Sequence, residues 1–162
     1  RLAIGQGSGV DYTELLKLAR QTELETGPAI KDANVREHLA DWYVETQGLK
    51  YTKFRTLTAL SKGETPGPES SIGKIVSGPK MQDLASFAMD LQGQGGILQG
   101  DEDAEMNAAF QNQWMWGAGY RIAGGTDEIL RNIVSEQVLG LPQDIRVDKK
   151  VPFNELPGSG RK

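Results

Sequence analysis

The stretch from residue 33 to residue 61 contains no proline and a single glycine, Gly48. Apolar and half-polar side chains recur along it at intervals of three and four, which is the spacing of one face of an α-helix. They are Val35, Leu39, Trp42, Thr46 and Leu49, and Phe54, Leu57 and Leu60 continue the stripe. A helix of this length limits the possible architectures, because long helices joined by shorter connections favour an antiparallel bundle.

The remaining sequence predicts further helices. Asp11 and Glu14 have the spacing of a capping box, so a helix is expected to start near Tyr12 and to end at Gly27–Pro28. Three more apolar stripes predict helices over 72–91 (with Pro79 as a kink), 103–118 and 126–139. No stretch alternates with a period of two, so a sheet is not expected.

The predicted fold is therefore all-α, an antiparallel four-helix-type bundle with an extra short helix and an extended C-terminal tail. The bundle is expected to cover residues 1–142, and the proline-containing, mostly polar tail to cover 143–162. The shared helical period predicts these core residues: Leu15, Leu39, Trp42, Ile75, Phe87, Ile129 and Ile133.

Composition excludes several classes of function. The chain has 162 residues and a net charge of −4, which offers no electrostatic reason to expect a nucleic acid or an anionic membrane as partner. No apolar run approaches the ~20 residues of a membrane-spanning helix. The absence of cysteine excludes disulfides and thiolate catalysis and fits a reducing, cytoplasmic location. The single histidine, His38, argues against metal clusters and Ser-His-Asp catalysis.

Two glycine-rich stretches and one aromatic group have ordinary structural explanations. The segment "IGQGSG" (4–9) lacks the βαβ context of a dinucleotide fingerprint, so we interpret it as a connector. The loop 93–100 is expected to be an interhelical turn. Trp114, Trp116 and Tyr120 favour packing or a subunit interface over a cradle for a planar ligand.

The segment "RIAGGTDEILRNIV" (121–134) places two glycines and a threonine where a helix must start. A helix N-terminus exposes unpaired N–H groups that suit an electron-rich ligand, and Gly124 and Gly125 would permit its close approach. Asp127 and Glu128, however, would repel a phosphate. From the residues alone, a helix capped by Thr126 and a ligand site are equally supported.

The stretch "YRIAGGTDEILRNIVSEQVLGLP" (120–142) strongly resembles the C-terminal signature of acyl-CoA dehydrogenases. The similarity includes "LAD" (39–41), Lys74 at the end of the stretch "PESSIGK" (68–74), and the glycine loop in "DLQGQGG" (90–96). The ending "DIRVDKKVPFNELP" resembles the actinobacterial branch. The resemblance covers nearly the whole chain, but only the C-terminal domain of the family's enzymes.

The resemblance implies a four-helix bundle and a function. Complete members of the family remove two hydrogens from an acyl-CoA to give the trans-2-enoyl thioester, with FAD as hydride acceptor and a carboxylate as base. It further implies acyl-CoA as substrate, an electron-transfer acceptor, and homo- or hetero-oligomers formed through the bundle. Trp114 and Trp116 are the candidate contact residues.

Individual residues can be carried over from the family's motifs. Thr126 matches a threonine near the flavin, beside Gly125, and Glu128 matches a position that often contacts the cofactor. Gly93 resembles the glycine loop that meets FAD of an adjacent subunit. Arg20 corresponds to the arginine of an "R-x-Q-F-G" element that binds FAD phosphates, although Gln21, Thr22 and Glu23 depart from that pattern.

The catalytic base is the main departure from the family pattern. Many members have glutamate at the position of Gly124, and glycine cannot accept a proton. A second subgroup places the glutamate in an earlier helix, directly before a stretch like "RLAIG", where it would precede Arg1. The sequence therefore predicts no catalytic residue within the chain.

Three hypotheses follow. The first is the C-terminal domain of a flavin-dependent acyl-CoA dehydrogenase, separated from its N-terminal domains and inactive alone. The second is a non-catalytic portion of a heteromeric dehydrogenase, kept for assembly and half of an FAD site. The third is a helical interaction domain unrelated to flavin. The actinobacterial resemblance of the tail suggests lipid or sterol side-chain substrates.

Overall fold

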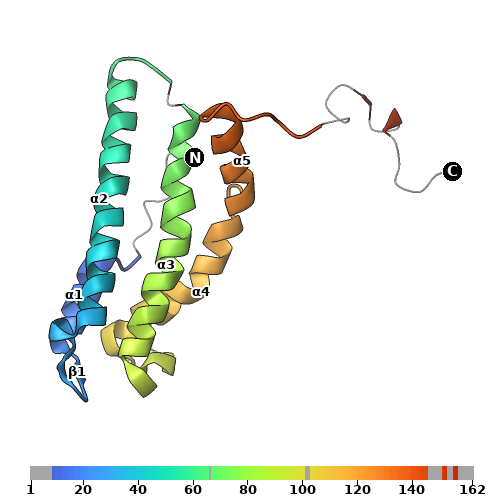
Figure 1. The fold of residues 1–162 in the computed structure, drawn as a ribbon. Coiled ribbons are helices and arrows are strands. Elements are labelled where there is room, and N and C mark those ends of the chain that lie inside the picture. The colour runs from blue at the N-terminus through green and yellow to red at the C-terminus, as the bar shows by residue number, and fades with distance from the viewer. Residues whose placement is uncertain (1–8, 66, 101–102, 146–150, 153–154, 157–162) are drawn as a thin grey trace.

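A computed structural model describes residues 9–65, 67–100, 103–145, 151–152 and 155–156. Within these ranges the chain is mostly helical, in agreement with the predicted all-α fold (Figure 1). The α-helices are α1 (Tyr12–Gln21), α2 (Ala33–Ser61), α3 (Ser71–Leu91), α4 (Ala109–Ile122) and α5 (Asp127–Gln137). The short elements are β1 (Glu23–Leu24), β2 (Gly27–Pro28) and the 3-10 turns η1 (Ala29–Lys31), η2 (Pro68–Ser70), η3 (Gly93–Ile97) and η4 (Glu105–Ala108).

The long helices pack in an antiparallel arrangement. Figure 1 shows α2 and α3 antiparallel, with α1 beside the first part of α2. Helices α4 and α5 both run back along α3, one after the other, and each contacts α3. The amide of Gln113 in α4 donates to the carbonyl of Met81 in the second half of α3, whereas Lys74 near the start of α3 reaches the α4–α5 turn. Helices α4 and α5 thus together take the place of the fourth helix of the bundle, interrupted by the turn between them.

Helix α1 begins at the predicted capping box. The Asp11 carboxylate accepts from the Thr13 amide at 2.8 Å, and the Glu14 carboxylate accepts from the Asp11 amide at 3.1 Å. Burial alone would raise the pKa of Glu14, but hydrogen bonds from the Asp11 amide and the Thr13 hydroxyl lower it to about 2. The carboxylate that caps α1 is therefore ionised at neutral pH.

The predicted end of α1 at Gly27–Pro28 is wrong. The helix ends at Gln21 because Thr22 is extended, with φ −85° and ψ 131°. The chain then folds back as a two-residue antiparallel pair, β1 with β2, whose turn includes Gly27 at φ 118°. A pair this short has no alternating apolar pattern, so the sequence carried no strand signal for it.

Helices α2 and α3 agree with their predicted ranges. The Asp32 carboxylate caps α2 by accepting from the amides of Asn34 and Val35. Helix α3 continues through Pro79. Both stripes of apolar residues therefore lie on continuous helices, as their spacing predicted.

The predicted start of the fourth helix at residue 103 is wrong. Helix α4 begins at Ala109, because the three preceding residues all have left-handed backbones. The φ angles are 53° at Met106, 56° at Asn107 and 54° at Ala108. A right-handed helix cannot pass through such residues. Residues 101–102 lie outside the described ranges.

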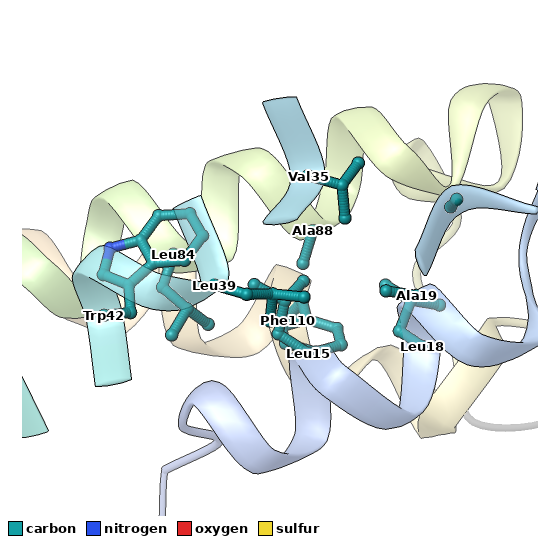
Figure 2. Close-up of a cluster of buried hydrophobic side chains, with 10 residues drawn as sticks. Leu15, Leu18, Ala19, Val35, Leu39, Trp42, Leu84, Ala88 and Phe110 are labelled. Carbon is teal, nitrogen blue, oxygen red and sulfur yellow. The ribbon is translucent and has the colours of Figure 1, made fainter. Parts of the chain in front are cut away.

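The core lies where α1, α2, α3 and α4 meet (Figure 2). Its buried members are Leu15, Leu18, Ala19, Ala29, Val35, Leu39, Trp42, Leu84, Ala88 and Phe110. The predicted core residues Leu15, Leu39 and Trp42 are confirmed, and Phe87 is half-buried against this cluster.

The prediction of Ile129 as a core residue is wrong, since 52% of its surface is exposed. Helix α5 packs along α3 on one side, and that side carries the buried residues Asp127 and Leu130. Ile75 and Ile133 are half-buried. The apolar stripe of α5 is wider than the face that α3 covers, which is why spacing alone misplaced Ile129.

The predicted tail is described only in part. Gly140, at φ 69°, ends α5 together with a hydrogen bond from the Leu141 amide to the Ser135 carbonyl. Residues 143–145 are exposed and have no regular structure. Most of "IGQGSG" and most of 146–162 lie outside the described ranges, so the division at residue 142 stays a prediction. None of the helices that the structure describes is both long and apolar enough to cross a membrane.

Candidate functional site

The α4–α5 turn, residues 122–126, requires glycine at two successive positions. Helix α4 ends at Ile122, and the Ala123 amide still donates to the Gly119 carbonyl at 3.0 Å. The φ angle then becomes 68° at Gly124 and 118° at Gly125. Residues with a Cβ adopt such angles only at a cost, so the glycine pair reverses the backbone between α4 and α5.

Thr126 caps helix α5. Its hydroxyl oxygen accepts from the Ile129 amide at 3.3 Å, and its carbonyl accepts from the Leu130 amide at 3.0 Å. The capping interpretation of Thr126 is therefore confirmed. The half-buried threonine also lines a cavity, so capping does not remove it from a candidate ligand site.

The two acidic residues of the first turn of α5 have different environments. Asp127 is buried, and its Oδ2 accepts from the Arg121 Nε at 2.6 Å. Arg121 in turn donates through Nη1 to the Gln82 side-chain oxygen at 3.0 Å, which ties both helices to α3. The expectation that Asp127 would repel an anion must be corrected, because Arg121 compensates its charge.

Glu128 is exposed beside this ion pair. Hydrogen bonds from its own backbone amide and from the Thr126 hydroxyl lower the pKa of Glu128. Its carboxylate is ionised at neutral pH and weakens the attraction of this helix N-terminus for a phosphate. The turn is thus better suited to an uncharged, hydrogen-bonding part of a ligand than to its phosphates.

A cavity of about 270 Å³ lies at the turn and extends between α3, α4 and the start of α5. It is lined by Gln82, Ala118, Arg121, Ile122, Thr126, Asp127 and Glu128. Sites for drug-sized ligands usually measure ~300–1,000 Å³ and enclose most of the ligand. The cavity is smaller than such sites and opens to the surface, so it does not form a complete ligand site by itself.

The predicted site residues fall into two groups. Thr126, Glu128 and Gly125 lie together at the α4–α5 turn. Arg20 is exposed in the last turn of α1, and Gly93 is exposed at the start of η3 with φ 58°. Both lie where α1 and α3 end, at the lower end of the bundle in Figure 1, away from that turn. Their proposed contact with a cofactor stays a prediction.

A pair of alanine substitutions tests the conformation of the turn. Gly125→Ala forces a Cβ onto a residue at φ 118° and should lower the free energy of unfolding by about 1–3 kcal/mol. Gly119 lies in α4, two residues before Arg121, and a Cβ added there would have no atom within 4 Å. Gly119→Ala should therefore raise the free energy of unfolding by about 0.5–1 kcal/mol. Urea unfolding of both variants measures the difference, and equal effects of the same sign would disprove the glycine-dependent turn.

Comparison with known proteins identifies the family. A model of the acyl-CoA dehydrogenase C-terminal domain matches residues 6–139. The chain belongs to the acyl-CoA dehydrogenase family. This confirms the resemblance seen in the sequence and excludes a helical domain unrelated to these enzymes.

Curated relatives among the acyl-CoA dehydrogenases are mycobacterial. The chain is 29% identical over 136 residues to acyl-CoA dehydrogenase IpdE1 of Mycolicibacterium smegmatis, which covers 84% of the chain and 31% of that protein. It is 28% identical over 142 residues to acyl-CoA dehydrogenase FadE34 of Mycobacterium tuberculosis, which covers 88% of the chain and 18% of that protein. The chain thus spans less than a third of the length of these relatives.

Solved structures of other proteins share the fold. A chain of the ChsE4-ChsE5 complex from Mycobacterium tuberculosis superposes with a TM-score of 0.71 at 21% identity. The superposition covers 82% of the present chain and 35% of the chain from the complex. Butyryl-CoA dehydrogenase from Megasphaera elsdenii superposes with a TM-score of 0.65 at 15% identity. The superposition covers 79% of the present chain and 32% of the butyryl-CoA dehydrogenase chain. The helical arrangement described above is the fold of the family's C-terminal domain.

Sequence reasoning missed the residues that organise this acyl-CoA dehydrogenase turn. Arg121 and Asp127 are six residues apart and meet only because the chain reverses between them. Lys74 was noticed for its resemblance alone, yet its ammonium group donates to the carbonyl of Gly125. The signal that could have found it is a lysine on the apolar side of a helix, where burial demands acceptors.

Proposed function

We propose that the chain is the C-terminal domain of an FAD-dependent acyl-CoA dehydrogenase that converts an acyl-CoA to its trans-2-enoyl thioester. The family match over residues 6–139 is the observation that carries this proposal. The incomplete cavity beside Thr126 supports it, because a domain of a larger enzyme is expected to supply only part of a site. The short span relative to the curated relatives supports it equally.

The residues of the turn have specific roles in this proposal. Gly125 permits close approach, and Thr126 and Glu128 offer a hydroxyl and a carboxylate at the cavity. FAD, when bound, supplies the hydride-accepting chemistry of the family. Gly93 and Arg20, at the other end of the bundle, would contact the FAD of an adjacent subunit. The chain's contribution is to position the cofactor and exclude water from one side.

The base is proposed to lie outside the chain. Gly124 has no side chain, and the buried carboxylate of Asp127 is held in an ion pair by Arg121, whose side chain is partly exposed. The lowered pKa of Glu128 makes its carboxylate a weak proton acceptor. A carboxylate directly upstream of Arg1, or one on a partner subunit, would serve instead.

A second candidate function is the non-catalytic portion of a heteromeric dehydrogenase. The solved relatives include a ChsE4-ChsE5 complex and a steroid dehydrogenase named for two chains, Tcur3481-Tcur3483. Helix α4 exposes Trp114, Met115 and Trp116, of which Trp116 is 76% exposed, and these side chains suit a subunit interface. The residue encoded immediately before Arg1 separates the two candidates, since a glutamate there favours the catalytic chain.

The substrate that we propose is the CoA thioester of a lipid or of a sterol side chain. The Tcur3481-Tcur3483 relative is described as a steroid acyl-CoA dehydrogenase, and the tail of the chain resembles the actinobacterial branch. An electron-transfer protein would reoxidise the cofactor.

The isolated chain is expected to be inactive. The 162 residues lack a base and form only part of the cofactor site, so the purified chain should contain little flavin and oxidise no acyl-CoA. Visible absorbance measures the flavin, and reduction of an artificial electron acceptor measures turnover over a panel of acyl-CoAs. The intact protein, with its partner subunit if it has one, is the control. Acyl-CoA oxidation by the isolated chain would contradict the proposed division of the site.

A further inference from the structure

Lys74 is a buried lysine whose acceptors lie in the last turn of α4 and in the α4–α5 turn. It stands in the first turns of α3 and is 8% exposed. Its ammonium group donates to the carbonyl of Gly125 and, at 3.4 Å, to the carbonyl of Arg121. It also lies 5.8 Å from the centre of the Tyr120 ring. One side chain thus connects the last turn of α4 with the residue before the cap of α5.

The charge of Lys74 is stabilised by carbonyl groups. Among the side chains that the structure describes, no carboxylate lies within 4.0 Å of its Nζ. The acceptors are carbonyl oxygens at the C-terminal end of α4, where the helix dipole is negative, and beyond it. A buried ammonium group costs free energy unless acceptors surround it, so Lys74 and the turn hold each other in place.

The turn needs such a contact because its own residues provide few. Gly124 and Gly125 have no side chains, and their left-handed backbones forgo the hydrogen bonds of a continuing helix. Hydrogen bonds of the Ala123 amide and the Thr126 hydroxyl hold the two ends of the turn. The Gly125 carbonyl between them accepts its hydrogen bond from Lys74 in α3. Without that contact, the position of Thr126 relative to α3 would depend on two flexible residues.

We propose that Lys74 is a positioning residue that clamps the α4–α5 turn and so sets where Gly125 and Thr126 meet the cofactor. This role rests on the proposed function for its catalytic consequence, whereas the clamping itself is a property of the bundle. Loss of the ammonium group should free the turn while leaving the rest of α3 in place. The consequence should be weaker retention of flavin.

Lys80 provides a matched control on the same helix. It is half-buried, and its ammonium group donates to the Trp42 carbonyl at 3.2 Å and to the Thr46 hydroxyl, both on α2. Burial lowers the pKa of Lys80, although Glu45 and Asp11 oppose that effect. Lys80 therefore links helices in the same chemical way as Lys74, but away from the turn.

The test compares Lys74→Met, Lys74→Arg and Lys80→Met in the intact protein. Hydrogen exchange of the Ala123 and Ile129 amides reports the turn, and the visible absorbance reports bound flavin. A charge-assisted hydrogen bond is worth enough to make exchange at these amides about 10- to 100-fold faster in Lys74→Met. Lys80→Met should leave it unchanged, and Lys74→Arg, which keeps the charge and the donors, should restore most of the protection.

The outcomes separate the inference from the proposed function. Faster exchange at the turn in Lys74→Met alone, with loss of flavin, supports both. Faster exchange in an intact protein that never binds flavin supports the clamp and overturns the proposed function. Unchanged exchange in Lys74→Met, or equal acceleration in Lys80→Met, overturns the clamp. If Lys74→Met does not fold, the exchange rate at the turn in Lys74→Arg tests the clamp. Exchange in Lys74→Arg as fast as in the unfolded chain would contradict a role for the charge.

Discussion

Replacing Phe110 by alanine is expected to lower the free energy of unfolding of the chain by about 3–5 kcal/mol. Phe110 is fully buried where α4 meets α1 and α3, and Figure 2 shows its ring beside Leu15 at the centre of the core. Its removal leaves a cavity that neighbouring helices cannot close without losing their own contacts. Small domains are stable by only ~5–15 kcal/mol, so this one change would remove much of the margin.

Phe54→Ala is the matched control for Phe110→Ala. Phe54 lies on α2 and is 49% exposed, so its truncation should change the free energy of unfolding by less than about 1 kcal/mol. Urea unfolding followed by far-ultraviolet circular dichroism measures both variants. Equal losses for the two phenylalanines would show that the core is not centred on Phe110.

Changing the catalytic carboxylate to its amide is expected to produce the second large effect. If a glutamate precedes Arg1, its replacement by glutamine in the intact protein should reduce turnover by about 100- to 10,000-fold. Flavin should remain bound, because the turn around Thr126 does not depend on that side chain. Steady-state kinetics and flavin absorbance measure the two quantities separately. Full activity without a carboxylate upstream of Arg1, at position 124 or on a partner subunit would show that the base has been misassigned.

Local patterns predicted the helices well where capping and periodicity agreed. The start of α1 was predicted from the capping box of Asp11 and Glu14, and the range of α2 from its apolar spacing and its lack of proline. The structure adds Asp32 as the cap at the start of α2. The start of α4 was missed because nothing in the residue types of Met106, Asn107 and Ala108 requires a left-handed backbone.

The candidate site was predicted only as far as it is local. The glycine pair before Thr126 was recognised as a special helix start, and the structure supplies the reason in two positive φ angles. The contact of Lys74 with Gly125 joins residues 51 positions apart, and no spacing rule reaches that far. The ion pair of Arg121 with Asp127, which compensates one of the two acidic charges expected to repel an anion, was missed for the same reason, because it depends on how the turn folds.

The most direct test of the central claim is the response of the flavin in the intact protein to acyl-CoA. The protein, with its partner subunit if it has one, would be purified and titrated without oxygen with lipid and sterol side-chain CoA thioesters while its visible absorbance is recorded. We predict that flavin copurifies with the protein and that at least one thioester bleaches it, with the 2-enoyl thioester as product. A protein without flavin, or a bound flavin that no acyl-CoA reduces, would contradict the assignment as part of an acyl-CoA-oxidising enzyme.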